Sequence, residues 1–167
     1  MMRTWIYMVI AACGVSCTQK PVQTEPSKEE LMDYNKLALK KESVMIDRYV
    51  EAQQWPVVTS GSGLRYYIYQ PGAGDSVRTE DRITVKMTIT LLNGDTCYSH
   101  LKYGPEAFTV DYDHHESGLH EAVKKMTVGS KAKVILPSHL AFGVAGDHDK
   151  IPMRATVVYD LEIVSKN

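Results

Sequence analysis

The segment from Val123 to Ile163 constrains the fold more than any other part of the chain. It contains, in order, the end of a helix, a tight Val128-Gly129 turn, an apolar strand, an Ala-Phe-Gly turn and an Ile151-Pro152 corner. In the strand that follows, apolar residues occupy every second position, which is the period of a strand with one buried face. This order predicts antiparallel strands packed on a short helix, and therefore an α+β domain.

The residues before this segment extend the same architecture. Strands are predicted at 64–69, 83–91 and 108–110, and Asn93-Gly94 is a strong hairpin turn signal after the second of them. Residues 117–126 have the apolar spacing of a brief helix. Together these elements predict an antiparallel sheet that curls over one short helix, which is a half-barrel.

A separate N-terminal helical segment is predicted at 27–56. Ser27 and Glu30 have the spacing of a capping box, and apolar residues then recur at steps of three and four. The helical stretch contains no Gly or Pro, and the Trp55-Pro56 pair ends it. One long helix fits this pattern, and so do two helices with a break near Lys41.

Residues 1–16 are predicted to be a signal peptide that does not belong to the fold. Arg3 precedes an apolar run that is too short for a membrane span and is followed by polar sequence. This pattern resembles a bacterial lipoprotein signal, in which a cysteine becomes the acylated first residue. Cys17 is favoured because it leads directly into a polar tether at 17–26. Acylation at Cys13 and an ordinary cleaved signal are the alternatives.

The lipoprotein-like signal predicts a lipid-anchored protein of the bacterial cell envelope, on the periplasmic side or at the outer membrane. Composition otherwise excludes functions more than it assigns them. The 19 Lys and Arg nearly balance the 20 Asp and Glu, so the net charge is −1 and no basic field indicates nucleic-acid binding. Function therefore has to be argued from motifs.

From Gly63 to Val164 the chain resembles the FKBP-type peptidyl-prolyl cis-trans isomerases. The resemblance rests on Gly-Ala-Gly-Asp at 72–75, Val128-Gly129, Ala141-Phe142-Gly143, the Ile-Pro corner and the final strand, in the family's order and spacing. It implies an FKBP-like antiparallel half-barrel at 57–167, preceded by the long helix. It also implies an activity, the isomerisation of X-Pro peptide bonds.

The chemistry that the resemblance implies needs no nucleophile, acid, base, metal or cofactor. Rotation about a peptide bond has a barrier of about 18–20 kcal/mol, because resonance stiffens the C–N bond. A dry apolar cup removes water from the carbonyl and favours the twisted, less polar transition state. The residues to find are therefore the lining of a cup, without any catalytic acid, base or nucleophile.

The resemblance implies a substrate pocket in which part of the family lining is replaced. Leu119 stands where the family usually has a floor tryptophan, Met87 replaces a tyrosine, and Phe142 lacks the hydroxyl of the family's tyrosine. The residues before the floor helix align with His115 and Glu116. The predicted pocket residues are Met87, Cys97, Tyr98, Phe108, Val110, Leu119, Phe142, Ile151 and Tyr159.

Two functions fit this altered lining. The first is a peptidyl-prolyl isomerase that acts on exported or envelope proteins, with proline-containing polypeptides as partners. The alternative is a non-catalytic FKBP-like binding or chaperone module that keeps the cup without turnover. The helical segment at 27–56 fits a homodimerisation arm, as in some exported members of the family, and equally a spacer above the membrane.

Two polar clusters invite other interpretations. Imidazoles and carboxylates gather in Asp111, Asp113, His114, His115, Glu116 and His120. Such groups suit zinc or nickel, but their spacing matches no dedicated motif, and a solvated loop entering a helix explains them as well. No metal site is predicted. Residues 147–149 occupy the place of the family's variable flap and are expected to contact a bound peptide.

Overall fold

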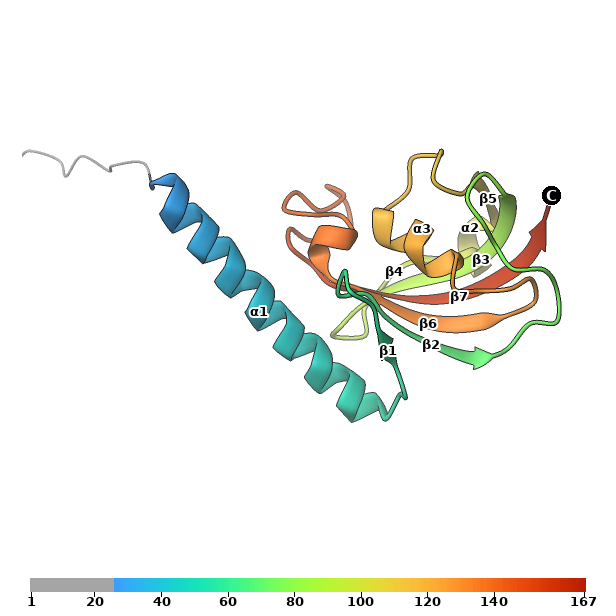
Figure 1. Cartoon of the computed structure of the whole chain (residues 1–167), viewed down its shortest axis with the longest axis horizontal. Helices are drawn as coiled ribbons and strands as arrows, with labels where there is room; N and C mark the ends of the chain where they lie inside the picture. The colour runs from blue at the N-terminus through green and yellow to red at the C-terminus, as the bar shows by residue number, and fades with distance from the viewer. Residues whose placement is uncertain (1–25) are drawn as a thin grey trace, which may run out of the picture.

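The computed structural model describes residues 26–167, which form a long helix followed by a sheet domain (Figure 1). A single sheet of seven strands carries the domain, and all of its strand pairs are antiparallel. The elements are α1 (Lys28–Gln53), β1 (Val58–Thr59), β2 (Arg65–Gln70), β3 (Arg82–Leu91), β4 (Thr96–Ser99), α2 (His100–Tyr103), β5 (Glu106–Thr109), α3 (Ser117–Val123), β6 (Lys131–Leu136), the 3₁₀ turn η1 (Ser138–Leu140) and β7 (Val157–Lys166).

The sheet follows the order β1-β2-β6-β7-β3-β4, with β5 paired to β3. Its centre is the long pair β3 and β7, in which Ile89 lies opposite Tyr159 and Met87 opposite Leu161. The sheet curves around one side of α3 (Figure 1). The predicted α+β half-barrel with a long N-terminal helix is therefore confirmed.

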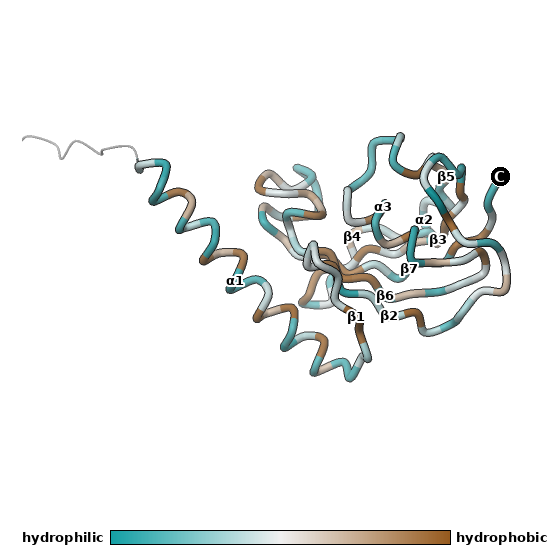
Figure 2. The backbone as a smooth tube through the Cα atoms, in the orientation of Figure 1, coloured by the Kyte–Doolittle hydropathy of each residue, from teal (hydrophilic) through white to brown (hydrophobic). Residues whose placement is uncertain are grey.

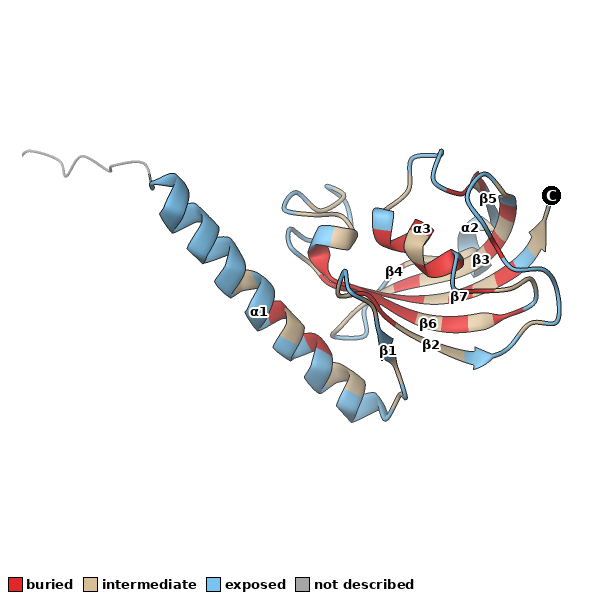
Figure 3. Ribbon diagram, in the orientation of Figure 1, coloured by how far each residue is buried: buried red, intermediate tan, exposed pale blue. Residues whose placement is uncertain are grey.

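The core lies between α3 and the concave face of the sheet (Figure 3). Leu119 and Val123 of α3 are fully buried against strand residues such as Val85 and Leu136, because alternate strand positions face the helix. Gly118 permits the close approach of α3 to β6. A Cβ at this position would lie 2.7 Å from a methyl of Leu136.

The hairpin after β3 forms at the predicted turn. The N–H of Leu91 donates to the carbonyl of Asp95 at 2.9 Å, and Gly94 takes a positive φ of 92° that favours glycine. The strand that the turn leads into, β4, and the one-turn helix α2 are not in the sequence prediction. Both are four residues long, so neither shows a readable apolar period.

Helix α1 is one unbroken helix of 26 residues, which decides between the two alternatives for this segment. The capping box forms, with the Ser27 N–H donating to Glu30 at 2.8 Å and the Glu30 N–H to the Ser27 hydroxyl at 3.2 Å. Apolar and polar residues alternate along the helix (Figure 2), and several of the apolar ones are exposed. Within α1 only Glu42 and Ile46 are buried.

Buried polar contacts join α1 to the sheet domain. Glu42, 7% exposed, accepts hydrogen bonds from the Ser138 N–H at 2.7 Å, the Ser138 hydroxyl at 2.9 Å and the Thr156 hydroxyl at 2.7 Å. Arg65 on β2 donates to Asp47 at 2.7 Å, and Ile46 packs on two strand residues of the sheet's outer side. Since Ser138 and Thr156 flank the loop that contains residues 143–154, here called the flap, α1 also supports both ends of that loop.

The predicted signal peptide at 1–16, the acylation sites Cys17 and Cys13, and nearly all of the tether at 17–26 lie outside the described residues. Between residues 26 and 167, no helix combines the length and the apolar character that crossing a membrane requires.

Candidate functional site

A cavity of about 240 Å³ opens at one end of the half-barrel. It is bounded by the central strands, by β4 and α2, and by the residues just before α3. Its walls combine apolar side chains, aromatic rings and two carboxylates. The residues that line it are Met87, Ile89, Tyr98, Ser99, His100, Tyr103, Gly104, Glu106, His115, Glu116 and Tyr159.

Of the residues predicted to form a pocket, the structure brings Met87, Tyr98 and Tyr159 together in this lining. Each comes from a different strand, β3, β4 and β7, so their meeting depends on the pairing of β3 with both neighbours.

The other predicted pocket residues belong to the core rather than to the cavity lining. Phe108, Val110 and Leu119 are at most 1% exposed, because their side chains fill the space between α3 and the sheet. Cys97 and Ile151 are also buried, and Phe142 packs half-buried against the same core. These residues back the cavity, and a direct role in substrate binding stays a prediction for them.

The floor of the cavity contains two polar atoms without hydrogen-bond partners. Tyr159 is fully buried and its hydroxyl is unpaired, as is the Oε2 atom of Glu116. Burial, followed by the nearby Glu116 charge, raises the pKa of Tyr159 well above 10.0, so the group remains a hydroxyl. The two side chains lie close without meeting hydrogen-bond geometry. Unpaired buried polar atoms cost about 1–3 kcal/mol each, so the floor is a costly arrangement within an otherwise apolar core.

The rim of the cavity is tied to the flap. The Tyr98 hydroxyl donates to Oδ2 of Asp147 at 2.5 Å, and this hydrogen bond is the main cause that raises the pKa of Tyr98. The Lys150 ammonium lies 4.7 Å from the centroid of the Tyr98 ring and 5.5 Å from that of Tyr103. It also donates to the Tyr103 hydroxyl at 3.1 Å.

His115 and Glu106 complete the lining of the cavity. The His115 Nε2 atom lies 3.4 Å from Oε1 of Glu106, and the His115 ring stacks at a tilt on Phe108 with 4.3 Å between centroids. Glu106, Tyr103 and His100 are cavity residues that sequence reasoning missed. The alignment of His115 and Glu116 with residues before the floor helix was the available signal for this part of the lining.

The comparisons with known proteins agree with this architecture. The family model described as FKBP-type peptidyl-prolyl cis-trans isomerase matches residues 74–164, more than half of the chain. The chain belongs to the FKBP family. FKBP relatives include FK506-binding protein 4 of Dictyostelium discoideum, 36% identical over 109 residues, which are 65% of this chain and 30% of that protein. The isomerase FkpA of Aeromonas hydrophila is 35% identical over 114 residues, 68% of this chain and 42% of FkpA.

A solved FKBP structure supports the fold. The crystal structure of FkpA from Escherichia coli superposes with a TM-score of 0.66 at 23% identity, covering 86% of this chain and 75% of that one. The chain spans less than half of the length of the two curated FKBP relatives named above.

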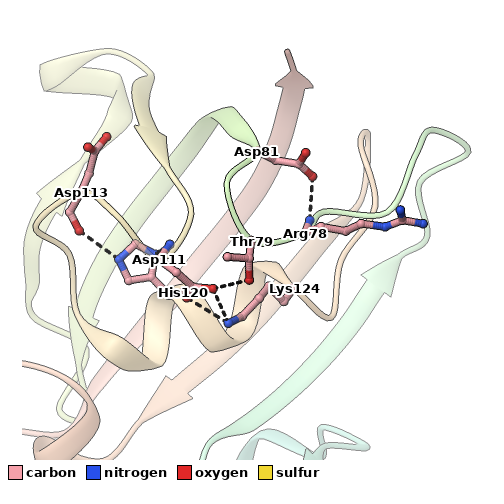
Figure 4. Close-up of polar contacts among 7 residues, drawn as sticks. All are labelled: Arg78, Thr79, Asp81, Asp111, Asp113, His120 and Lys124. Atoms are coloured by element: carbon pink, nitrogen blue, oxygen red, sulfur yellow. Dashed lines mark hydrogen bonds and ion pairs between the residues drawn. The ribbon is translucent and has the colours of Figure 1, made fainter.

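The acidic and histidine-rich segment before α3 fastens a loop of the FKBP domain to that helix (Figure 4). The backbone N–H of Asp111 donates to Nδ1 of His120 at 3.0 Å, so Nε2 carries the proton that reaches the Asp113 carbonyl at 3.1 Å. Lys124 binds the Asp111 carboxylate at 2.7 Å, and Thr79 donates to it at 2.6 Å. Among residues 26–167, no group of three or more His, Cys, Asp or Glu side chains is arranged to hold a metal ion.

A larger cavity of about 500 Å³ lies between α1 and the flap side of the FKBP domain. Tyr34 and Met45 of α1 line it, together with Ser138, Val144 and Arg154. The Arg154 guanidinium lies 5.3 Å from the Tyr34 ring centroid. This space is formed by the helix and loop, whereas the smaller cavity is built on the central strands that define the FKBP half-barrel.

Proposed function

We propose that this FKBP-family chain catalyses the cis/trans isomerisation of X-Pro bonds in exported or envelope proteins. The observation that carries the proposal is the cavity over β3 and β7, where Met87, Ile89 and three tyrosine rings provide a largely apolar wall. The family membership supports the choice of proline-containing polypeptides as substrates.

The cavity would act by shape and by exclusion of water. A proline ring seated against Met87 and Ile89 brings the X-Pro carbonyl to the rim, where the tyrosine rings replace water. Loss of that water weakens the charge-separated resonance form and lowers the barrier to rotation. The Tyr98 hydroxyl is already donated to Asp147, so we assign it to closure of the flap and not to the peptide carbonyl.

A protease-free isomerisation assay on the purified chain, with several X-Pro peptides, tests this function. We expect a rate above that of buffer, and a loss of most of that rate in Met87→Trp, because the larger side chain fills the cavity. Val58→Trp, at a position 53% exposed on β1, is the matched control and should keep the rate. A rate equal to that of buffer with every peptide would rule out the isomerase.

The second candidate is a binding or chaperone module without turnover. The observation that favours it is that Leu119 is fully buried in the core, so that the cavity floor is lined by the polar groups of Glu116 and Tyr159 and not by Leu119. Such a module would bind the same peptides, and Met87→Trp would abolish binding, while the isomerisation rate would remain that of buffer.

The proposal includes a lipid anchor at Cys17, with Cys13 as the alternative, in an envelope protein whose residues 1–16 are removed. Mass spectrometry of the mature N-terminus tests the anchor, since an unmodified terminus excludes it.

The proposal also includes a homodimer through α1, supported by the exposed Leu31, Leu37 and Met45 on that helix. Light scattering of the chain and of Leu37→Lys tests the dimer, because the introduced charge should dissociate it.

A further inference from the structure

Among residues 26–167, the carboxylates of the cavity lining are not balanced by any Lys or Arg of that lining. Glu106 and Glu116 are both part of it, and within the described residues no Lys or Arg lines it. Both carboxylates act on the fully buried Tyr159 hydroxyl, so their field reaches the floor. A cavity with low-dielectric walls strengthens such a field relative to open solvent.

The floor also holds a carboxylate whose negative charge no cation in the described part of the chain compensates. A carboxylate oxygen is an acceptor only, and Oε2 of Glu116 is buried without a donor. The Tyr159 hydroxyl beside it has no acceptor and no donor in the structure. A ligand carrying an ammonium or guanidinium group would neutralise the Glu116 charge and could donate to its Oε1 atom, whereas an apolar or acidic ligand would leave that charge uncompensated.

Two aromatic rings of the cavity lining already contact a cationic side chain of the protein itself. Lys150 from the flap places its ammonium over Tyr98 and Tyr103, and both rings also line the cavity. An ammonium over the face of a tyrosine is stabilised by the ring quadrupole. Lys150 is exposed, so a basic side chain from a bound peptide can displace it at low cost.

We propose that the cavity selects proline peptides that carry a Lys or Arg side chain adjacent to the proline, with Glu116 as the recognition group and Lys150 as an internal competitor. The inference rests on the proposed function, because it assumes that the proline-containing segment occupies this cavity. It assigns a substrate class and a specificity-determining residue to that function.

The experiment compares three tetrapeptides that differ only before the proline: Lys, its apolar isostere norleucine, and Glu. A second series varies the residue after the proline in the same way. Affinity is measured by calorimetry and isomerisation by NMR exchange, with the same chain and buffer. We expect Lys to be favoured over norleucine by roughly three- to tenfold in one of the two series, and Glu to be the poorest.

Variants locate the source of the preference. Glu116→Gln keeps the shape and should abolish it, while Lys150→Met should increase the affinity for Lys peptides. Glu162→Gln, which removes a half-buried carboxylate of β7 paired with Lys86 and Lys131 and outside the cavity lining, is the control and should change nothing. A preference that survives Glu116→Gln overturns the inference.

The remaining outcomes separate this inference from the isomerase proposal. Equal isomerisation of the Lys, norleucine and Glu peptides overturns the inference and leaves the isomerase standing. Preferential binding of Lys peptides without isomerisation supports the inference and overturns catalysis. If no peptide binds, both are overturned.

Discussion

The hydroxyl of Tyr98 on β4 lies 2.5 Å from the carboxylate of Asp147 on the flap, so this side-chain hydrogen bond ties the loop to the rim of the cavity. The Asp147 carboxylate also accepts from the backbone N–H groups of Asp149 at 2.9 Å and Ile151 at 2.8 Å, which shapes the flap itself. Together with the hydrogen bond from Lys150 to Tyr103, the contact between Tyr98 and Asp147 sets the position of the flap relative to the cavity.

Tyr98→Phe should loosen the flap with a modest loss of stability. Removal of this charge-assisted hydrogen bond should lower the free energy of unfolding by about 1–2 kcal/mol and speed hydrogen exchange at residues 147–151. Tyr112→Phe is the control, because Tyr112 is exposed and its hydroxyl donates to Glu80 at 2.8 Å. Unchanged exchange in the flap would show that Tyr98 does not hold it.

Acidification should remove the contribution of Asp147. Burial alone would raise the pKa of this carboxyl, but hydrogen bonds from Tyr98 and from flap N–H groups outweigh it and hold the pKa below 3.8. A pKa lowered by folding stabilises the folded state fully above the ordinary value, and the stabilisation is lost as the pH falls through the folded value.

The stability difference between the wild-type chain and Asp147→Asn should therefore narrow as the pH falls from about 6 to about 2.5. Urea denaturation across this range measures it. Asp33→Asn, at an exposed position of α1, should follow the wild-type curve throughout. A constant gap between the wild-type chain and Asp147→Asn would contradict the prediction.

Glu42→Ala should be among the most damaging single substitutions in α1. It leaves the Ser138 N–H and the Ser138 and Thr156 hydroxyls without their acceptor in a buried site. We expect a loss of roughly 3 kcal/mol in the free energy of unfolding, and close to zero for the exposed Glu51→Ala. Chemical denaturation distinguishes them, and similar losses in both variants would remove the special role of Glu42.

Gly118→Ala should destabilise the packing of α3 on β6. The added Cβ would meet the Leu136 methyl at 2.7 Å and the Leu140 carbonyl at 2.8 Å, so helix and strand must separate. The expected cost is about 1–3 kcal/mol, read as a lower melting temperature. Gly61→Ala meets nothing within 4 Å and should melt like the wild-type chain. A melting temperature unchanged in Gly118→Ala would mean that the helix adjusts freely.

Tyr159→Phe should leave the fold as stable as before, or raise its stability by up to about 1 kcal/mol. The hydroxyl that is lost has no hydrogen-bond partner, so only its desolvation cost disappears. Thermal and urea unfolding check this. A loss of more than about 1 kcal/mol would indicate that Tyr159 donates to Glu116 in solution.

The sequence was informative where structure repeats locally. Alternating apolar residues predicted β3 and β7, and the capping box at Ser27 and Glu30 predicted the start of α1. It was less informative about the cavity, because an apolar residue near the site can face either the core or the lining. Phe108 and Leu119 face the core, while Ile89 borders the cavity.

The failure to predict some of the cavity residues has a related cause. Tyr103 and Glu106 reach the cavity only because β4, which leads into α2, and β5 both pair with β3. The pairing of β5 with β3 joins residues far apart in the sequence, and both α2 and β5 are too short to show an apolar period. By contrast, the unpaired state of Glu116 and Tyr159 is a property of the assembled floor and has no counterpart in the sequence.

The buried hydrogen bonds of Glu42 fix helix α1 rigidly to the half-barrel, so the two move together. A helix of 26 residues is about 39 Å long, and its contacts with the sheet domain hold it at a set angle. Whatever holds the Lys28 end of the helix therefore also sets the direction in which the cavity mouth points. A rotation of α1 about its Lys28 end would thus turn the whole half-barrel through the same angle.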